Sequence, residues 1–197
     1  MELEIIEYIL NEEKDESGVY AISLVSAPAI ESTFVNLNEH KVEMKLIDEE
    51  RGILLGAALI PDKKILRRGA PDYYIWFSKD TVRRTSELFM ERSHHQDTTL
   101  EHEFTLDGNT IVETWIKESE QDKSVFHGID APVGTWFVAM KIKNEEILAK
   151  AKRGELNGFS IEGLFDDTEE KTEGDLSKED QLLRELNYLI EQISNNN

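Results

Sequence analysis

Short runs of apolar residues, some alternating and some continuous, recur along most of the chain and predict a strand-rich protein. Residues 3–10 and 18–25 predict two strands, and the polar residues 11–17 between them predict a hairpin loop. Residues 53–60 are continuously apolar, which favours a strand buried on both faces. The other predicted strands are residues 42–47, 73–77, 100–106, 110–117, 134–142 and 158–165.

Helices are predicted where a capping residue precedes a suitable segment. Ser78 can cap a helix over residues 79–92, and Asn144 can cap a helix that ends near Lys152. The turn 107–109 predicts a hairpin between its flanking strands. Because most connections are too short for a crossover helix, we expect mainly antiparallel pairing. The predicted fold class is α+β, with a mainly antiparallel β-barrel of about seven strands, surrounding helices and a C-terminal helix.

The composition changes after residue 165, which divides the chain into three predicted parts. Residues 1–165 form the main domain, and residues 166–176 are an acidic, solvated linker. Residues 177–197 form an amphipathic helix that starts at Ser177. Its apolar stripe consists of Leu182, Leu183, Leu186, Leu189, Ile190 and Ile193.

Charge and composition exclude several classes of function. The chain has 22 Lys and Arg against 41 Asp and Glu, a net charge of −19, so we expect no nucleic-acid or anionic-membrane partner. Because cysteine is absent, disulfides, thiolate-bound zinc and a cysteine nucleophile are excluded. The apolar run 52–60 is too short for a membrane span, and the acidic start lacks the basic region of a signal peptide. We therefore expect a soluble, cytoplasmic protein.

Three histidines lie close together in residues 93–103. His94 and His95 fit either a metal site or a polar loop, and the loop is favoured because their spacing matches no zinc motif. No metal or cofactor is therefore expected. His102 falls on the apolar face of the predicted strand 100–106, where it is either a core histidine or a partly desolvated general base.

A serine between two glycines is the second candidate for chemistry. Ser160 lies in a predicted strand with Gly158 before it and Gly163 after it, and these glycines allow another backbone, such as a substrate strand, to approach. The strand period places Ser160 and Glu162 on one face. The segment is not the nucleophile elbow of α/β-hydrolases, and a strand serine is more often structural than catalytic.

Several segments together resemble the prohead proteases of tailed bacteriophages, which are serine peptidases with a fold similar to herpesvirus assemblin. The resemblance covers roughly residues 18–165 and implies that His102 is the general base and Ser160 the nucleophile. The segments that carry it are residues 100–102, 111–116, 134–140 and, above all, 154–163.

Residues 21–29 resemble a stretch that follows the catalytic serine in many prohead proteases, but here they precede the histidine, which suggests a circular permutation. In those relatives the stretch begins with a glutamate that is the third catalytic member, whereas this chain has Ala21. The third role therefore has two candidates. Glu113 is favoured, and Glu162 is the alternative. The loop after Val25 is the expected source of oxyanion-binding N–H groups.

The resemblance implies a serine endopeptidase that acts during prohead maturation, inside the phage procapsid in the host cytoplasm. Its implied substrates are the scaffold or core protein, pro-segments of the major capsid protein, and the protease itself. Whether the chain forms a homo-oligomer, as the herpesvirus relatives form dimers, is left open by the sequence. An inactive, scaffold-associated structural protein on the same fold is the alternative, which Ala21 favours. A metal-dependent hydrolase is the third interpretation.

Overall fold

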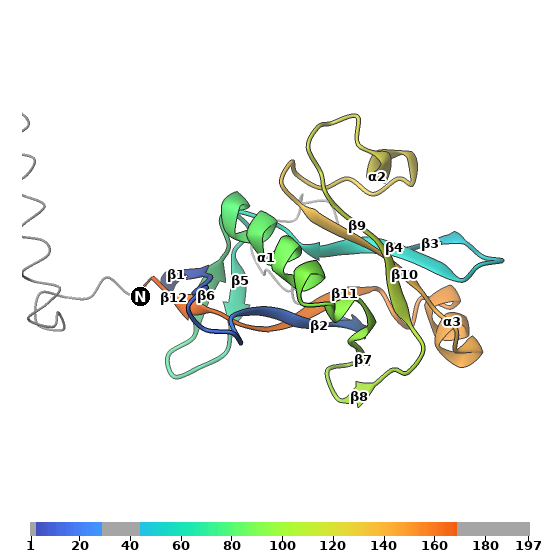
Figure 1. Cartoon of the computed structure of the whole chain (residues 1–197), viewed down its shortest axis with the longest axis horizontal. Helices are drawn as coiled ribbons and strands as arrows, with labels where there is room; N and C mark the ends of the chain where they lie inside the picture. The colour runs from blue at the N-terminus through green and yellow to red at the C-terminus, as the bar shows by residue number, and fades with distance from the viewer. Residues whose placement is uncertain (1–2, 29–43, 169–197) are drawn as a thin grey trace, which may run out of the picture. The chain divides into compact units, whose positions relative to one another are not determined.

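The computed structural model describes residues 3–28 and 44–168, whose strands form three four-stranded sheets (Figure 1). The described residues up to Asp167 belong to one compact unit. The predicted C-terminal helix over 177–197 and the linker beyond Thr168 lie outside the described residues.

The first sheet has the order β12-β1-β6-β5 and contains a pairing that corrects the predicted hairpin. Strand β1 pairs with β12 in antiparallel fashion and with β6 in parallel fashion, so it does not pair with the next strand along the chain. Asp166 and Asp167 therefore belong to the folded unit rather than to the predicted linker. The strands are β1 Glu4–Ile9, β5 Ile65–Arg67, β6 Tyr73–Trp76 and β12 Asp166–Asp167.

The second sheet supplies most of the core and has the order β3-β4-β10-β9, with antiparallel pairing throughout. Every residue of β4 is buried, as its continuous apolar run predicts. Trp136 and Phe137 begin the other central strand and are completely buried. The strands are β3 Lys45–Asp48, β4 Ile53–Leu59, β9 Thr110–Ile116 and β10 Trp136–Lys141.

The third sheet has the order β11-β2-β7-β8 and carries the candidate site. Strand β2 pairs antiparallel with β11 and parallel with β7. The second and third sheets approach closely where a Cβ on Gly56 would lie 3.0 Å from the ring of Phe159. The absence of a side chain at Gly56 thus leaves room for Phe159, the residue directly before Ser160 on β11. The strands are β2 Gly18–Val25, β7 Thr98–Leu100, β8 Phe104–Thr105 and β11 Gly158–Leu164.

The α+β class and the mainly antiparallel pairing are confirmed, whereas the described strands do not close into the predicted barrel. Two local features explain the difference. The predicted strand 100–106 is broken by Glu101 and His102, whose φ angles are 51° and 60°. The turn 107–109 leads from β8 in the third sheet to β9 in the second, so it does not close a hairpin.

The helices begin where their capping residues predict. Helix α1 spans Lys79–Glu91, and the Ser78 side chain accepts a hydrogen bond from the Thr81 N–H. Helix α3 spans Glu145–Lys152, and Asn144 caps it in the same way. A short helix α2, Lys123–Phe126, and a single 3₁₀ turn, His94–Gln96, complete the helical segments. No helix in the described part of the chain is long and apolar enough to span a bilayer.

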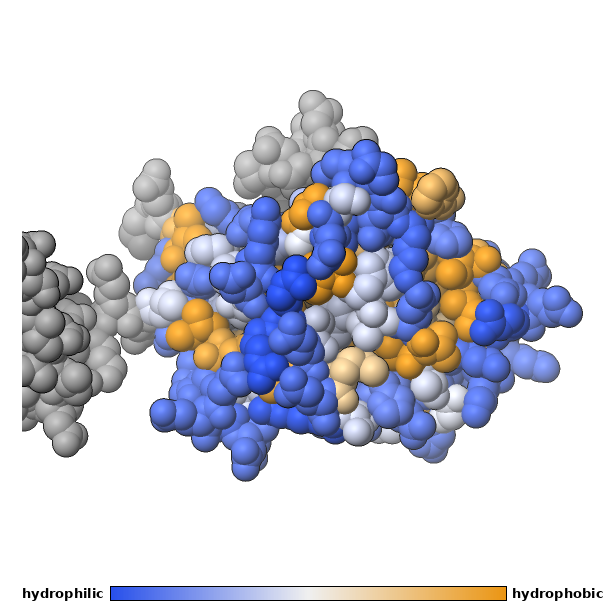
Figure 2. All heavy atoms as spheres, turned by 45° about the horizontal axis from the view of Figure 1, so that its top comes forward, coloured by the Kyte–Doolittle hydropathy of each residue, from blue (hydrophilic) through white to orange (hydrophobic). Residues whose placement is uncertain are grey.

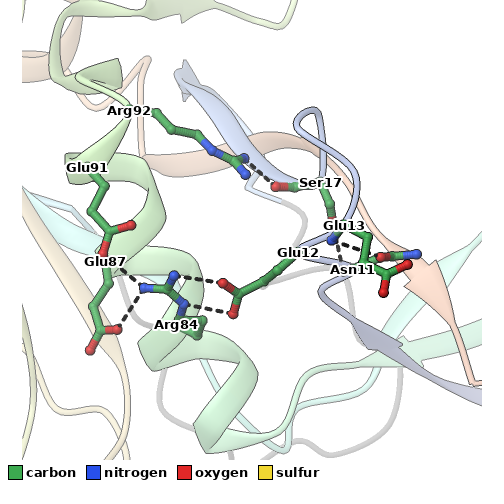
Figure 3. A network of polar contacts seen from close by, with 8 residues as sticks. All are labelled: Asn11, Glu12, Glu13, Ser17, Arg84, Glu87, Glu91 and Arg92. Atoms are coloured by element: carbon green, nitrogen blue, oxygen red, sulfur yellow. Dashed lines mark hydrogen bonds and ion pairs between the residues drawn. The ribbon is translucent and has the colours of Figure 1, made fainter.

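Side chains of helix α1 contact the polar loop between β1 and β2 (Figure 3). The Arg84 guanidinium binds both carboxylate oxygens of Glu12, at 2.9 and 2.7 Å. The hydrogen bond from Arg84 lowers the pKa of Glu12. At the other end of the helix, Arg92 donates a hydrogen bond to the Ser17 carbonyl. The loop is therefore tied to the helix, and the two strands it connects enter different sheets.

Candidate active site

Polar side chains form one row across the third sheet. Ser160 on β11 lies opposite Ser23 on β2, and Ser23 lies opposite Thr99 on β7. Residues directly opposite one another project from the same face of a sheet, so these three hydroxyl groups share a face. Glu162, two residues after Ser160, projects from the same face, opposite Ala21. The strand period of the sequence predicts this pairing of Ser160 with Glu162.

His102 reaches this face from a tight turn, which corrects its predicted position on the apolar face of a strand. Because Leu100 pairs with Phe104, residues 101–103 form the loop of a hairpin. The backbone N–H of His102 donates to the Ser23 hydroxyl at 3.0 Å, which holds the turn against β2. The imidazole is 42% exposed, so it is not a core histidine.

The carboxylate of Glu162 holds the imidazole. His102 Nδ1 lies 3.1 Å from Glu162 Oε1, and the Thr99 hydroxyl donates to the same oxygen. The Glu162 side chain is only 18% exposed, so its orientation is restricted by its surroundings. A carboxylate accepts hydrogen bonds, which makes Nδ1 the protonated nitrogen and leaves Nε2 with the free lone pair. This is the tautomer that a general base requires.

Ser160 and His102 line one cavity of about 370 Å³. Ser160 is 8% exposed, whereas His102 stands at the more open side. No hydrogen bond joins the Ser160 hydroxyl to the His102 ring in the described structure. Such contacts commonly tighten only when substrate binds. The remaining lining residues are Ala27, Ala58, Leu59, Ile65, Arg67, Phe77 and Ile161.

The structure places Glu113, the favoured sequence candidate for the third role, in a different environment. It lies on β9 in the second sheet and forms an ion pair with Lys123. Strand β9 pairs with β10 and not with the hairpin that carries His102, so the predicted neighbourhood of Glu113 and His102 is not formed. Of the two carboxylates considered, Glu162 is the one that contacts the imidazole.

Of the other two clustered histidines, His94 has a polar contact within its own turn. His94 Nδ1 lies 2.7 Å from an Asp97 carboxylate oxygen in the turn after α1. Residues 3–28 and 44–168 contain no group of three or more side chains arranged to hold a metal ion.

The loop after Val25 borders the cavity and is held on two sides. The Ser26 N–H donates to Glu101 Oε1 at 2.8 Å, and the Asn157 side chain donates to the Ser26 carbonyl at 2.8 Å. A Cβ on Gly158 would lie 2.6 Å from the Pro28 ring. The space beside Gly158 is therefore filled by the protein's own loop, which differs from the substrate approach that we expected there.

Three residues of the site have no counterpart in the sequence-based prediction. Ser23 is a hydroxyl residue within the otherwise mainly apolar strand β2, and that pattern is a signal that the sequence offers, whereas Thr99 follows another threonine in β7 and carries no such signal. Arg67 ends a strand of only three residues, which is too short for periodicity to detect.

A family model described as "Putative phage serine protease XkdF" matches residues 41–169, more than half of the chain. The matched segment includes His102, Ser160 and Glu162 and excludes β1 and β2. No curated protein and no solved structure matches the chain.

Proposed function

We propose that this chain, which belongs to the XkdF family of phage serine proteases, is a serine endopeptidase with Ser160 as nucleophile and His102 as general base. Glu162 orients the His102 ring. The observation that carries the proposal is the 3.1 Å contact between Glu162 and His102 Nδ1 beside the cavity that Ser160 lines. A base held by a third group next to a hydroxyl is the arrangement that activates a serine.

The reaction follows from these roles. His102 Nε2 takes the proton from the Ser160 hydroxyl as its oxygen attacks the substrate carbonyl carbon, and the tetrahedral intermediate forms. His102 then gives that proton to the leaving amine, and an acyl-enzyme remains on Ser160. Water, activated by the same imidazole, hydrolyses the ester and regenerates the serine. The Glu162 carboxylate stabilises the imidazolium that exists between the two proton transfers.

The sheet register accounts for the alanine at position 21. Ala21 lies directly opposite Glu162, so side chains at these two positions project side by side from the same face. A carboxylate on β11 can thus serve the role that the resemblance assigns to position 21 on β2. This geometry supports Glu162 over Glu113, and it supports an active peptidase despite the alanine at position 21.

The oxyanion site is proposed at the loop after Val25. The Ser26 N–H is already bound by Glu101, and Pro28 has no N–H. Ala27 lies between them and lines the cavity. Its backbone N–H is therefore our candidate donor to the developing negative charge on the substrate oxygen.

Prohead maturation is the biological role that we propose for this peptidase, inside the procapsid in the host cell. The scaffold or core protein, pro-segments of the major capsid protein, and the chain itself are its proposed substrates. Membership of a phage protease family supports this role. The net charge of −19 also supports it, because like-charge repulsion disfavours retention on DNA once the genome enters.

A fluorophosphonate probe tests the nucleophile without knowledge of the substrate. We expect the probe to label Ser160, as located by mass spectrometry, and the label to disappear in Ser160→Ala. Cleavage of co-expressed scaffold and capsid proteins should disappear in the same variant. Ser119→Ala is the matched control, because this exposed serine lies outside the cavity. Equal cleavage by wild type and Ser160→Ala would exclude Ser160, and no labelling with no cleavage would support the inactive structural protein.

A further inference from the structure

An arginine lines the cavity that contains Ser160 and His102. Arg67 is the last residue of β5, at the edge of the first sheet, and lies opposite Tyr73. Its side chain is half-buried. Guanidinium groups in such positions are normally paired, because removing a charge from water costs free energy that a partner must offset.

Arg67 forms no ion pair with any carboxylate among residues 3–28 and 44–168. Its neighbour Arg68 is exposed and binds Asp72 at 2.5 Å. The contrast is informative because acidic residues outnumber basic ones by 41 to 22 in this chain. Burial raises the pKa of Tyr8, on β1 of the same sheet, to about 12, and the positive charge of Arg67 acts against that rise.

Apart from Arg67, Ser160 and His102, the residues that line the cavity are apolar. Leu59, Ile65 and Phe77 contribute fully buried side chains, and Ala58 and Ile161 add further apolar surface. A volume of about 370 Å³ is at the small end for ligand pockets, so it suits one side chain rather than a long peptide segment. An aliphatic stem against these walls and a carboxylate at Arg67 would complement both parts of the cavity.

We propose that Arg67 is a specificity-determining residue that binds the carboxylate of a glutamate or aspartate next to the scissile bond. The inference rests on the proposed peptidase function and names its substrate class, an acidic peptide. Arginine is suited to this role because its planar guanidinium can donate two parallel hydrogen bonds to one carboxylate. A free C-terminal carboxylate has the same chemistry, so the test must separate the two sources.

The first experiment determines the preference without an assumed cleavage site. Wild-type protein digests a mixed peptide library in which every C-terminus is amidated, and mass spectrometry identifies the new termini. We expect Glu and Asp to be enriched next to the cleaved bonds. The proposal would be overturned if cleavage occurred only in a matched library with free C-termini, at one or two residues from the end. Arg67 would then bind the C-terminal carboxylate of the substrate rather than a side chain.

The second experiment assigns the preference to Arg67. For one cleaved peptide and its Glu-to-Gln counterpart, we expect kcat/KM to differ by at least about tenfold, the effect of one hydrogen bond to a charged group. Arg67→Gln should remove this difference, and Arg67→Glu should favour the corresponding Lys peptide. Arg68→Gln is the matched control and should keep the wild-type preference, because Arg68 does not line the cavity.

The outcomes separate this inference from the proposed function. Cleavage that depends on Ser160 but treats Glu and Gln peptides equally would overturn the specificity and leave the peptidase. A glutamate preference that survives in Arg67→Gln would also overturn it. Absence of both cleavage and fluorophosphonate labelling would overturn the two together. If an Arg67 variant fails to fold, equal cleavage of the Glu and Gln peptides by the wild-type protein would still overturn the proposal.

Discussion

Replacing Glu162 by glutamine tests whether its carboxylate serves His102. The substitution keeps the size of the side chain and an oxygen that can accept a hydrogen bond, but it removes the negative charge 3.1 Å from Nδ1. Two unit charges about 4 Å apart attract by roughly 4 kcal/mol near a protein surface and roughly 1 kcal/mol in water. Because the His102 side chain is 42% exposed and that of Glu162 is 18% exposed, the value should lie between these limits.

We therefore expect Glu162→Gln to lose about 2–3 kcal/mol of transition-state stabilisation, or about 10²-fold in kcat. The loss should be smaller than the roughly 10⁴-fold that follows the loss of a fully buried triad carboxylate. KM should change little, because the imidazolium exists only after the reaction begins. Glu162→Asp should recover part of the activity, since it restores the charge on a shorter side chain.

The matched control is Glu113→Gln, which makes the same chemical change in the second sheet. Steady-state cleavage of a peptide substrate should show wild-type kcat for Glu113→Gln and the reduced kcat for Glu162→Gln. Thermal unfolding monitors the fold of both variants. A large loss in Glu113→Gln with full activity in Glu162→Gln would refute the assignment of Glu162 and return the third role to Glu113.

Two further predictions follow from the loop contacts around the site and the sheet. Gly158→Ala would place a Cβ 2.6 Å from the Pro28 ring, so the loop that carries Ala27 must shift. We expect the variant to lose about 1–3 kcal/mol of stability in denaturant unfolding and to have a lower kcat. Unchanged stability and kcat would show that the loop adapts freely. Hydrogen bonds from Lys14 and Asn11 lower the pKa of Asp166, so its contribution to stability is present above its unfolded pKa near 4 and is lost as pH falls through the lower folded value. Asp166→Asn should accordingly lower Tm at pH 7 and reduce the fall in Tm between pH 7 and pH 3, whereas an identical pH profile would show that the contact with Lys14 contributes nothing.

The surface agrees with the charge balance of the chain. Figure 2 shows a face that is mostly hydrophilic, with separate apolar patches rather than one continuous apolar surface. The cation that stands out in this acidic protein is Arg67, because it lines the cavity and lacks an ion-pair partner among the described residues. The positive charge of Arg67 would attract a substrate that has acidic side chains near the scissile bond.

The sequence by itself determined where helices begin and which strand is buried, because these features depend on residues close together in the chain. Ser78 and Asn144 start helices α1 and α3 because each side chain accepts N–H groups of its own first turn. The continuous apolar run of β4 required burial on both faces, and the structure provides it. The strand period alone also places Ser160 and Glu162 on one face, whatever strand pairs with β11.

Tertiary structure decided which strands meet, because pairing depends on contacts between residues far apart in the chain. Strand β1 pairs with β6 and β12 while β2 pairs with β7 and β11, so the apparent hairpin is divided between two sheets. The hairpin turn at Glu101 and His102 interrupts what alternation alone predicted as one strand. The parallel register of β2 and β7 then brings the imidazole to Glu162, 60 positions away, and leaves Glu113 with Lys123. Side-chain pattern therefore determined the face from which each acid projects, and long-range pairing determined which acid meets the histidine.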